Sequence, residues 1–408
     1  MSVNFYSRCT NYLLAFGLIF LLTPLRTIEI LAVSLILLNI FFYIKNVKEC
    51  NKLFKENRRF IFLLLLLPIY SLFMALIHLD GRLMAIPLVF FIPFILIMSL
   101  NYITLQKSLF LICTLIGAII TLIEVFMAVH IGAVRFDPTH YNTIYSGLFS
   151  STEAACCFYF MILFLENKKY LLSTLMFFVF VVMSVACLYM ASKGAIICLL
   201  IAIFCIPFFL LSWKKTLLFV TCSVFIVGIL FTGFKNSSYV ERFSEMFHSI
   251  EISEKNQVLS NSTGIRLQLY RASLICAKQH PFVGCNIEQA NTIKEDLMKK
   301  NQASLLAMDY QHFHSDFFNS LGKMGVIGAI FWCVFWVSTF AFFLLQREEN
   351  TGIKLSFNIS ILLVVTFFIN SLFDSMMAYG KGIMFLALVV IIAAAFNKQG
   401  QLSGSLER

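Results

Sequence analysis

One polar stretch of the sequence combines residue types that can perform acid–base chemistry. It reads Tyr310-Gln-His312-Phe-His314-Ser315-Asp316 and leads directly into an apolar run over 315–345 that is long enough to cross a membrane. Imidazole titrates near neutral pH, so a histidine here can act as a general base. His314 is predicted to lie at the membrane–water boundary, where a base can meet a substrate with a lipid tail and a polar head. The alternative is that His314 is an ordinary interfacial polar residue whose hydrogen bonds are satisfied and which has no catalytic role.

Three glycines follow His314 in the same run. Gly322, Gly325 and Gly328 recur every three residues, which predicts one stripe on a helix where another helix or a lipid can approach closely. The spacing of His314 and Gly325 corresponds to about three helical turns and predicts that both lie on one face. A glycine stripe is also typical of simple helix packing.

Cations stand at three further places where an anionic group could bind. Arg266 lies in Ser262-Thr-Gly-Ile-Arg266, and Lys193 lies in Ser192-Lys193-Gly194, between two apolar runs. Arg135 lies in a short polar stretch before Asp137. The planar fork of arginine suits phosphate and lysine adds a point charge, although a lysine at a helix end can also simply extend into the interface. Lys323, inside an apolar run, has no assigned role.

The motifs predict no metal site and exclude several enzyme classes. His312 and His314 have only Asp309 or Asp316 nearby in the sequence, which is a poor ligand set for zinc. The sequence contains no P-loop, no His-Glu-x-x-His and no Gly-x-Ser-x-Gly. ATP-driven transport and membrane metalloprotease chemistry therefore lose most of their support.

The composition places the chain in lipid. It has 408 residues, of which 60% are hydrophobic and 13% charged, with 46 Phe and only 7 Pro. A soluble protein carries about 25% charged residues, so this chain lacks the charge to cover a water-facing surface. Its apolar runs are continuous rather than alternating, which argues against a β-barrel. The predicted fold class is an all-α polytopic integral membrane protein.

Apolar windows predict about twelve transmembrane helices with both termini in the cytoplasm. In this orientation sixteen Lys and Arg fall in inside segments, against five in short outside loops. The bias accounts for most of the net charge of +10 and requires no nucleic-acid partner. The predicted spans are 11–25, 27–44, 60–77, 83–100, 108–131, 148–165, 170–191, 194–212, 216–233, 315–345, 355–373 and 383–396.

Four parts make up the predicted organisation. Their ranges are 1–233 for transmembrane helices one to nine, 234–313 for a large outer loop, 314–398 for helices ten to twelve, and 399–408 for a cytoplasmic tail. Apolar spacing in the loop predicts helices over Ser237–Ile250 and Ile287–Lys300. Cys276 and Cys285 also lie in the loop, where they can pair if it faces an oxidising compartment.

The histidine motif resembles that of the O-antigen ligase family, a group of polytopic enzymes that act on lipid-linked glycans. The family pattern is His, then Asn, Ser or Gln, nine residues, Gly, two residues, and finally Gly, Thr or Tyr. In this chain His314-Ser315, nine residues, Gly325, two residues and Gly328 fill every fixed position.

Three shorter elements strengthen this resemblance. Ser262–Arg266 and His280–Gly284 are similar to two elements of the family's large periplasmic loop. Ser192-Lys193-Gly194 resembles a third element, in which the family more often has Arg at the position of Lys193. The substitution keeps the charge and loses the fork, which makes the role of Lys193 less secure.

The resemblance implies a GT-C-like, inverting glycosyltransferase without a metal or other cofactor. Such an enzyme transfers O-antigen polysaccharide from undecaprenyl diphosphate to a sugar hydroxyl of lipid A–core, in lipopolysaccharide biosynthesis. It works among membrane lipids at the periplasmic face of the bacterial inner membrane. By this resemblance His314 is the general base, and Arg266, Lys193 and Arg135 bind the diphosphate. His312, Ser315, Gly325 and Gly328 are then structural positions of the motif.

Two other functions remain open from the sequence. An O-antigen polymerase performs the same chemistry on a lipid-linked glycan acceptor, but its usual outline has two notable periplasmic loops, and one is evident here. A flippase or transporter for lipid-linked glycans would carry charged residues along several spans. The predicted spans hold little charge besides Lys323, Glu124 and Glu153.

Overall fold

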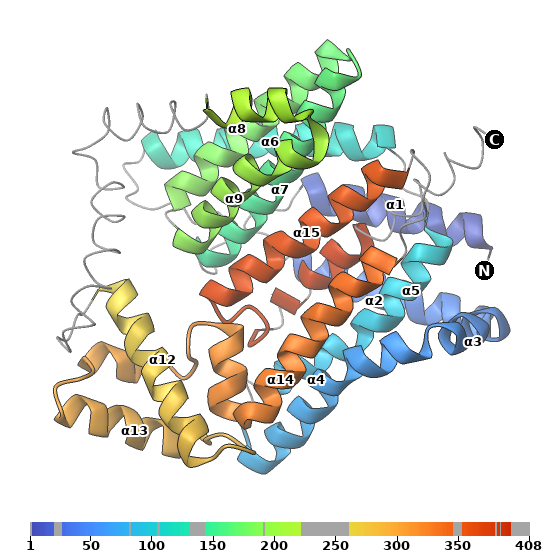
Figure 1. Cartoon of the computed structure of the whole chain (residues 1–408). Helices are drawn as coiled ribbons and strands as arrows, with labels where there is room; N and C mark the ends of the chain where they lie inside the picture. Colours follow the sequence, from blue (N-terminus) through green and yellow to red (C-terminus); the bar gives the residue numbers. More distant parts are fainter. Residues whose placement is uncertain are drawn as a thin grey trace.

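The computed structural model of the chain is built from helices (Figure 1). It describes residues 2–19, 27–80, 83–103, 107–130, 143–190, 192–221, 261–345, 353–379, 382–383 and 385–392, and these ranges contain no strand. The helices of the first half of the chain are α1 (Val3–Ile19), α2 (Thr27–Lys45), α3 (Val47–Glu56), α4 (Arg58–His78), η1 (Leu83–Phe91), α5 (Ile92–Tyr102), α6 (Lys107–His130), α7 (Thr143–Glu166), α8 (Tyr170–Met190) and α9 (Lys193–Leu210). The second half contains α12 (Ser262–Gln279), α13 (Ile287–Lys299), η2 (Leu305–Asp309), α14 (Asp316–Leu345) and α15 (Ile353–Phe373).

Five of the described helices are long and apolar enough to cross a membrane, which confirms a helical membrane protein. They comprise Arg58–His78, Leu111–Ala128, Ser146–Glu166, Tyr170–Met190 and Asp316–Leu345. Four shorter apolar helices, Val33–Lys45, Val89–Ser99, Lys193–Phe208 and Ser360–Phe373, coincide with further predicted spans. The total of twelve spans and the GT-C-like arrangement stay predictions.

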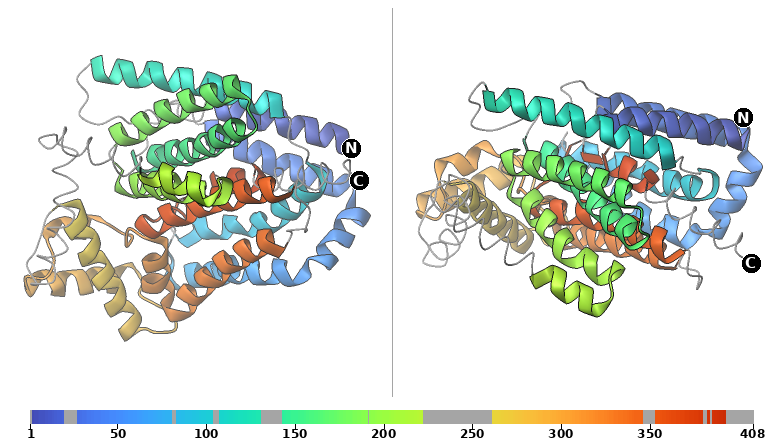
Figure 2. Two further views of the ribbon diagram at one scale, coloured as in Figure 1. Left: turned by 45° about the horizontal axis from the view of Figure 1, so that its top comes forward. Right: turned by 90° about the horizontal axis from the view of Figure 1, so that it is seen from above.

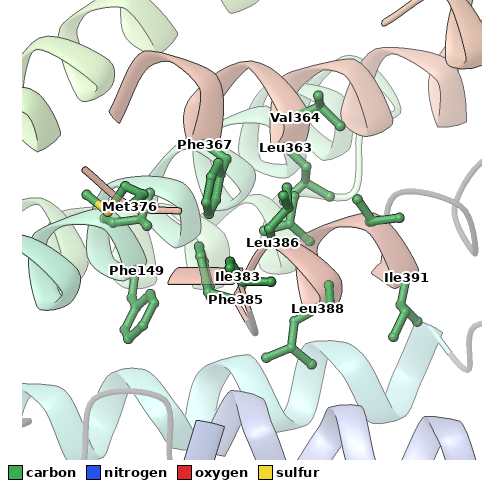
Figure 3. Packing of buried hydrophobic residues seen from close by; sticks show 14 of the residues in the cluster. Phe149, Leu363, Val364, Phe367, Met376, Ile383, Phe385, Leu386, Leu388 and Ile391 are labelled. Atoms are coloured by element: carbon green, nitrogen blue, oxygen red, sulfur yellow. The ribbon is translucent and has the colours of Figure 1, made fainter. Parts of the chain in front are cut away.

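The apolar core lies where α7 and α15 pack against each other and against the segment 385–392. Figure 3 shows side chains from all three converging, among them Phe149, Phe367 and Phe385. The ring centroids of Phe149 and Phe385 are 4.3 Å apart, and those of Phe367 and Phe385 are 6.2 Å apart. Aromatic contacts of this kind fix the end of α15 relative to α7, and the candidate site begins at that end of α15.

A small helical unit of α12, α13 and η2 lies at one end of the bundle, and the start of α1 lies at the other (Figures 1 and 2). Capping residues in this unit explain where α12 and α13 begin. The side chain of Asn261 accepts a hydrogen bond from the amide of Gly264, and Asn286 forms a capping box with Gln289. The helix predicted over Ile287–Lys300 is confirmed as α13, whereas Ser237–Ile250 lies outside the described residues.

A break in α14 corrects the predicted glycine stripe. Gly325 has φ 68° and ψ −168°, so the helix is interrupted there. The turn Pro281–Cys285 fills the break: the amide of Val326 donates to the Pro281 carbonyl at 2.7 Å, and the amide of Cys285 donates to the Gly322 carbonyl at 2.8 Å. At Gly325 the close approach is made by Pro281 and Phe282 of this turn, whereas Gly322 lies against the ring of Phe313 and the hydroxyl of Ser273 in α12.

The prediction that His314 and Gly325 share one helical face is also wrong. His314 precedes the first residue of α14 and has φ 50°, in the left-handed region. The irregular backbone at both positions explains the error, because the spacing argument assumes one uninterrupted helix.

Candidate active site

His314 lies in the turn that enters α14, with 8% of its surface exposed. Its carbonyl accepts a hydrogen bond from the Tyr270 hydroxyl at 3.1 Å. Burial raises the pKa of Tyr270 to about 12, so this hydroxyl keeps its proton and remains a donor. The ring of Tyr270 stacks on Phe318, with centroids 4.1 Å apart. These contacts hold the backbone of His314 in its left-handed conformation.

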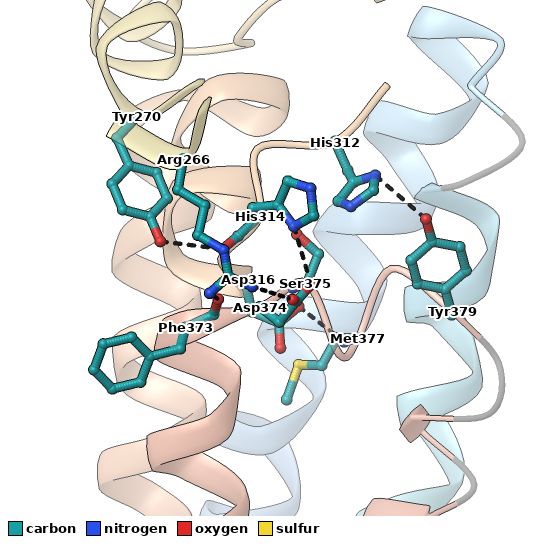
Figure 4. Close-up of polar contacts among 10 residues, drawn as sticks. All are labelled: Arg266, Tyr270, His312, His314, Asp316, Phe373, Asp374, Ser375, Met377 and Tyr379. Atoms are coloured by element: carbon teal, nitrogen blue, oxygen red, sulfur yellow. Dashed lines mark hydrogen bonds and ion pairs between the residues drawn. The ribbon is translucent and has the colours of Figure 1, made fainter. Parts of the chain in front are cut away.

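Asp374 orients the imidazole of His314. It follows α15 directly, and its Oδ1 atom lies 3.4 Å from Nδ1 of His314 and accepts from the Ser375 amide at 2.8 Å. The 3.4 Å contact is an ion-pair distance rather than a well-formed hydrogen bond. Because Nδ1 faces this carboxylate, Nε2 is the ring nitrogen that remains for a substrate (Figure 4).

Arg266 reaches the same carboxylate from α12. Its Nη2 donates to Oδ2 of Asp374 at 3.1 Å, and its Nη1 donates to the carbonyl of Phe373, the last residue of α15, at 2.6 Å. Burial raises the pKa of Asp374, but His314 and Arg266 outweigh it, and the net pKa lies below the ordinary value. Asp374 therefore stays ionised between a base and a cation (Figure 4).

Lys193, the first residue of α9, lies next to the start of α12. Its Nζ donates to the hydroxyl of Thr263 at 2.6 Å, in the first turn of α12. The neighbouring Gly194 packs on α15, since a Cβ there would lie 3.0 Å from Cβ of Phe373. Lys193 thus contacts the start of α12, and Arg266, in the same helix, contacts the end of α15. The start of a helix also carries partial positive charge.

His312 contributes a ring beside the base. Its Nδ1 lies 3.3 Å from the hydroxyl of Tyr379, and its ring centroid lies 4.4 Å from that of His314. The ring centroids of Tyr310 and His314 are 4.4 Å apart, and the two rings meet edge to face. His314 therefore has the rings of Tyr310 and His312 as neighbours, and Figure 4 shows His312 and the Asp374 carboxylate beside it.

A metal ion fits this group poorly. His312, His314 and Asp374 offer ligand atoms within 4.8 Å of one another, so the fold supplies a third candidate ligand that sequence spacing did not indicate. However, Oδ2 of Asp374 lies 3.1 Å from the guanidinium of Arg266 and Oδ1 accepts from the Ser375 amide. A divalent cation would be repelled by Arg266 and would compete with both bonds.

Buried polar atoms without a protein partner line the start of α14 and the turn after α15. The amide of Met377 donates to Oδ1 of Asp316 at 2.8 Å, which joins these two segments. Four further buried oxygens of these two described segments have no hydrogen-bond partner: Oγ of Ser315, Oδ2 of Asp316, Oδ1 of Asn319 and Oγ of Ser375. Buried polar atoms normally require partners, so this region suits water or a hydroxyl-rich ligand.

The structure brings most of the predicted site residues together. Arg266 and His314 contact the end of α15 and the residue after it, His312 lies beside His314, and Lys193 contacts the start of α12. Gly325 and Gly328 lie farther along α14, and the predicted site residue Arg135 lies outside the described residues. Asp374, Tyr270 and Tyr379 were not predicted from the sequence. Asp374 did carry one signal, because a carboxylate directly after an apolar span is costly and often functional.

The segment that supplies these residues matches a known family. Residues 178–333 match the sequence model of the family described as O-antigen ligase. No curated protein matches the chain. The matched range contains Lys193, Arg266 and the whole histidine motif, which confirms the resemblance based on that motif. Over residues 178–333 the chain is therefore similar to the O-antigen ligase family.

Proposed function

We propose that the protein is an O-antigen ligase. In this proposal it transfers O-antigen polysaccharide from undecaprenyl diphosphate to a sugar hydroxyl of lipid A–core at the periplasmic face of the inner membrane. The family match supports an activity of the O-antigen ligase type. The observation that carries the proposal further is the chain of contacts from His314 through Asp374 to Arg266.

His314 acts in this proposal as the general base. Its Nε2 removes the proton of the acceptor hydroxyl while the oxygen attacks the anomeric carbon of the donor sugar. The imidazole becomes positively charged at that moment, and the ionised Asp374 at 3.4 Å stabilises the charge. Without such a partner, a buried imidazolium would be costly.

Arg266 and Lys193 act on the leaving group. As the anomeric carbon–oxygen bond breaks, negative charge grows on the diphosphate, and fixed cations stabilise it. Arg266 donates two N–H groups to Phe373 and Asp374, and its guanidinium has further N–H groups that can donate to a phosphate oxygen. Two fixed cations and the start of α12 replace the charge that a metal ion would otherwise supply. A single displacement of this kind inverts the anomeric configuration.

The unpartnered oxygens beside His314 suit a sugar. Ser315, Asp316, Asn319 and Ser375 present hydroxyl, carboxylate and amide oxygens in a buried region. Glycan hydroxyls both donate and accept hydrogen bonds, so they can satisfy such atoms where an apolar ligand cannot. This observation favours a glycan substrate over a purely lipid one.

Reconstitution with purified substrates tests the proposal. The protein in vesicles would receive undecaprenyl-diphosphate-linked O-antigen together with either lipid A–core or a second lipid-linked glycan. Product on lipid A–core, also in excess chelator, is the expected result. Elongation of the lipid-linked glycan alone would identify a polymerase, and movement of donor without transfer would identify a transporter. Either outcome contradicts the proposal. His130→Ala, at an exposed position at the end of α6, is the matched control for substitution of His314.

A further inference from the structure

Two buried thiols lie together in the unit formed by α12, α13 and η2. Cys276 is in the last turn of α12, and Cys285 precedes α13; both are free thiols, 0% and 1% exposed. They belong to the same apolar cluster, which also contains Leu269, Ile293 and Leu297. Neither residue contacts the His314–Asp374 group through any described bond. The candidate mechanism leaves this pair without a role.

The backbone between the two cysteines reverses its direction. The amide of His280 donates to the Cys276 carbonyl at 2.8 Å, and the amide of Gly284 donates to the His280 carbonyl at 2.8 Å. Two successive turns therefore bring Cys285 back to the end of α12, where the two thiols are neighbours in one buried cluster. The pairing closes a short loop and needs no movement of distant elements.

The thiolate is the form that attacks disulfides. Because both sulfurs are enclosed in the folded protein, the reaction must occur while the unit folds, before Ile293 and Leu297 of α13 cover them.

We propose that Cys276 and Cys285 form a disulfide in the mature protein. The Cys285 thiolate attacks the disulfide of a thiol oxidoreductase and forms a mixed disulfide; the Cys276 sulfur then displaces the oxidoreductase. Two electrons pass from the two cysteines to the oxidoreductase, which leaves as a dithiol, and the two thiol protons are released to it or to solvent. The proposal shares with the proposed function only the placement of residues 261–313 in an oxidising compartment.

The disulfide would secure the turn that fills the break in α14. The Cys285 amide donates to the Gly322 carbonyl, and the Pro281 carbonyl accepts from Val326 on the other side of the break. The Tyr70 hydroxyl donates to the carbonyl of Phe282, which ties the same turn to α4. A cross-link from Cys285 to α12 therefore strengthens a contact between the outer unit and two membrane helices.

Tryptic cleavage sites allow a direct test. Cleavage after Arg271, Lys278 and Lys294 places Cys276 in the peptide 272–278 and Cys285 in the peptide 279–294, each with no other cysteine. Full-length protein from native membranes is alkylated under denaturing conditions without reductant and then digested. The proposal predicts that the two peptides are recovered as a linked pair, which separates only after reduction. Recovery of both peptides in alkylated form, or of either linked to another cysteine, would overturn it.

Four variants complete the test. Cys276→Ser and Cys285→Ser must each abolish the linked pair. The double variant Cys276→Ala/Cys285→Ala should unfold at a temperature several degrees lower, whereas Cys205→Ser/Cys333→Ser, at two exposed positions, should not. An inactive protein with the linked pair intact contradicts only the proposed function, and an active protein with free thiols contradicts only the disulfide.

Discussion

Nδ1 of His314 lies 3.4 Å from Oδ1 of Asp374, a residue that reaches it from the far end of α15. The contact joins the turn before α14 to the turn after α15, and Arg266 extends it to α12. A base, a carboxylate and a guanidinium are thus held by three separate elements. Because these elements are fixed by packing, the orientation of the imidazole depends on the whole helical frame.

Replacing Asp374 with Asn should slow transfer by about 10²–10⁴-fold in kcat, with little change in KM for the donor. The amide cannot stabilise the imidazolium and can hold the ring in the wrong tautomer. Steady-state kinetics in reconstituted vesicles measure the effect. Asp309→Asn, at an exposed position in η2, is the control. Wild-type kcat in the Asp374 variant would remove the carboxylate from the mechanism.

Arg266→Lys tests whether the guanidinium fork is required. A lysine cannot contact Phe373 and Asp374 and still reach a phosphate, and one charge-assisted hydrogen bond contributes about 1.5–3 kcal/mol. We expect kcat/KM for the donor to fall by about 10–100-fold. Thermal unfolding of the same sample separates this loss from a structural defect at the end of α15. If kcat/KM for the donor and the thermal stability fell in parallel, Arg266 would serve only the fold.

Substituting Gly325 with Ala should disrupt the junction of α14 with the Pro281–Cys285 turn. The φ of 68° disfavours any side chain, and a Cβ there would lie 2.4 Å from the Pro281 carbonyl oxygen. Strain of this kind costs about 1–3 kcal/mol before the collision is counted. Ala329→Gly, in the same helix, controls for altered helix propensity. Unfolding in detergent with an unchanged midpoint for Gly325→Ala would contradict the described break.

The ion pair of Lys323 with Asp80 should show strong coupling. Their side chains are 4% and 2% exposed, and Nζ lies 2.5 Å from Oδ2. Replacing one partner alone leaves a buried charge and costs about 3–5 kcal/mol, whereas Lys323→Met/Asp80→Asn removes both charges. A double-mutant cycle on the free energy of unfolding measures this difference. Additive losses would show that the two residues do not stabilise each other.

Lys294 should give the stability a characteristic dependence on pH. Burial and then the nearby Lys323 lower the pKa of Lys294 from 10.5 to about 8. Between these values the unfolded chain binds more protons than the folded chain, so the free energy of unfolding rises with pH. Lys294→Gln removes this contribution and keeps a donor for the Tyr310 carbonyl. Identical pH profiles for the two proteins between pH 8 and 10.5 would contradict the shift.

The sequence predicted the parts of the site that depend on local pattern. His314 and Arg266 stand in short polar motifs, and α13 has regular apolar spacing and a capping residue at Asn286. Asp374 could not be paired with His314, because only the packing of α14 against α15 and α12 brings them together. The break at Gly325 was hidden for a different reason: three glycines at regular spacing look the same in a straight helix and in an interrupted one.

The partner of Lys323 was likewise beyond local pattern. A lysine within an apolar run indicates a buried partner in general terms. Asp80 lies just beyond the end of α4, and only the contact between α4 and α14 identifies it.

The single-turnover rate of glycan transfer in vesicles, compared between wild-type protein and His314→Ala, tests the central claim most directly. Donor binding is measured in the same samples, so that a loss of chemistry is separated from a loss of binding. The proposed base predicts a rate lower by about 10²–10⁴-fold with donor affinity unchanged. A His314→Ala rate within about threefold of the wild-type rate would contradict it.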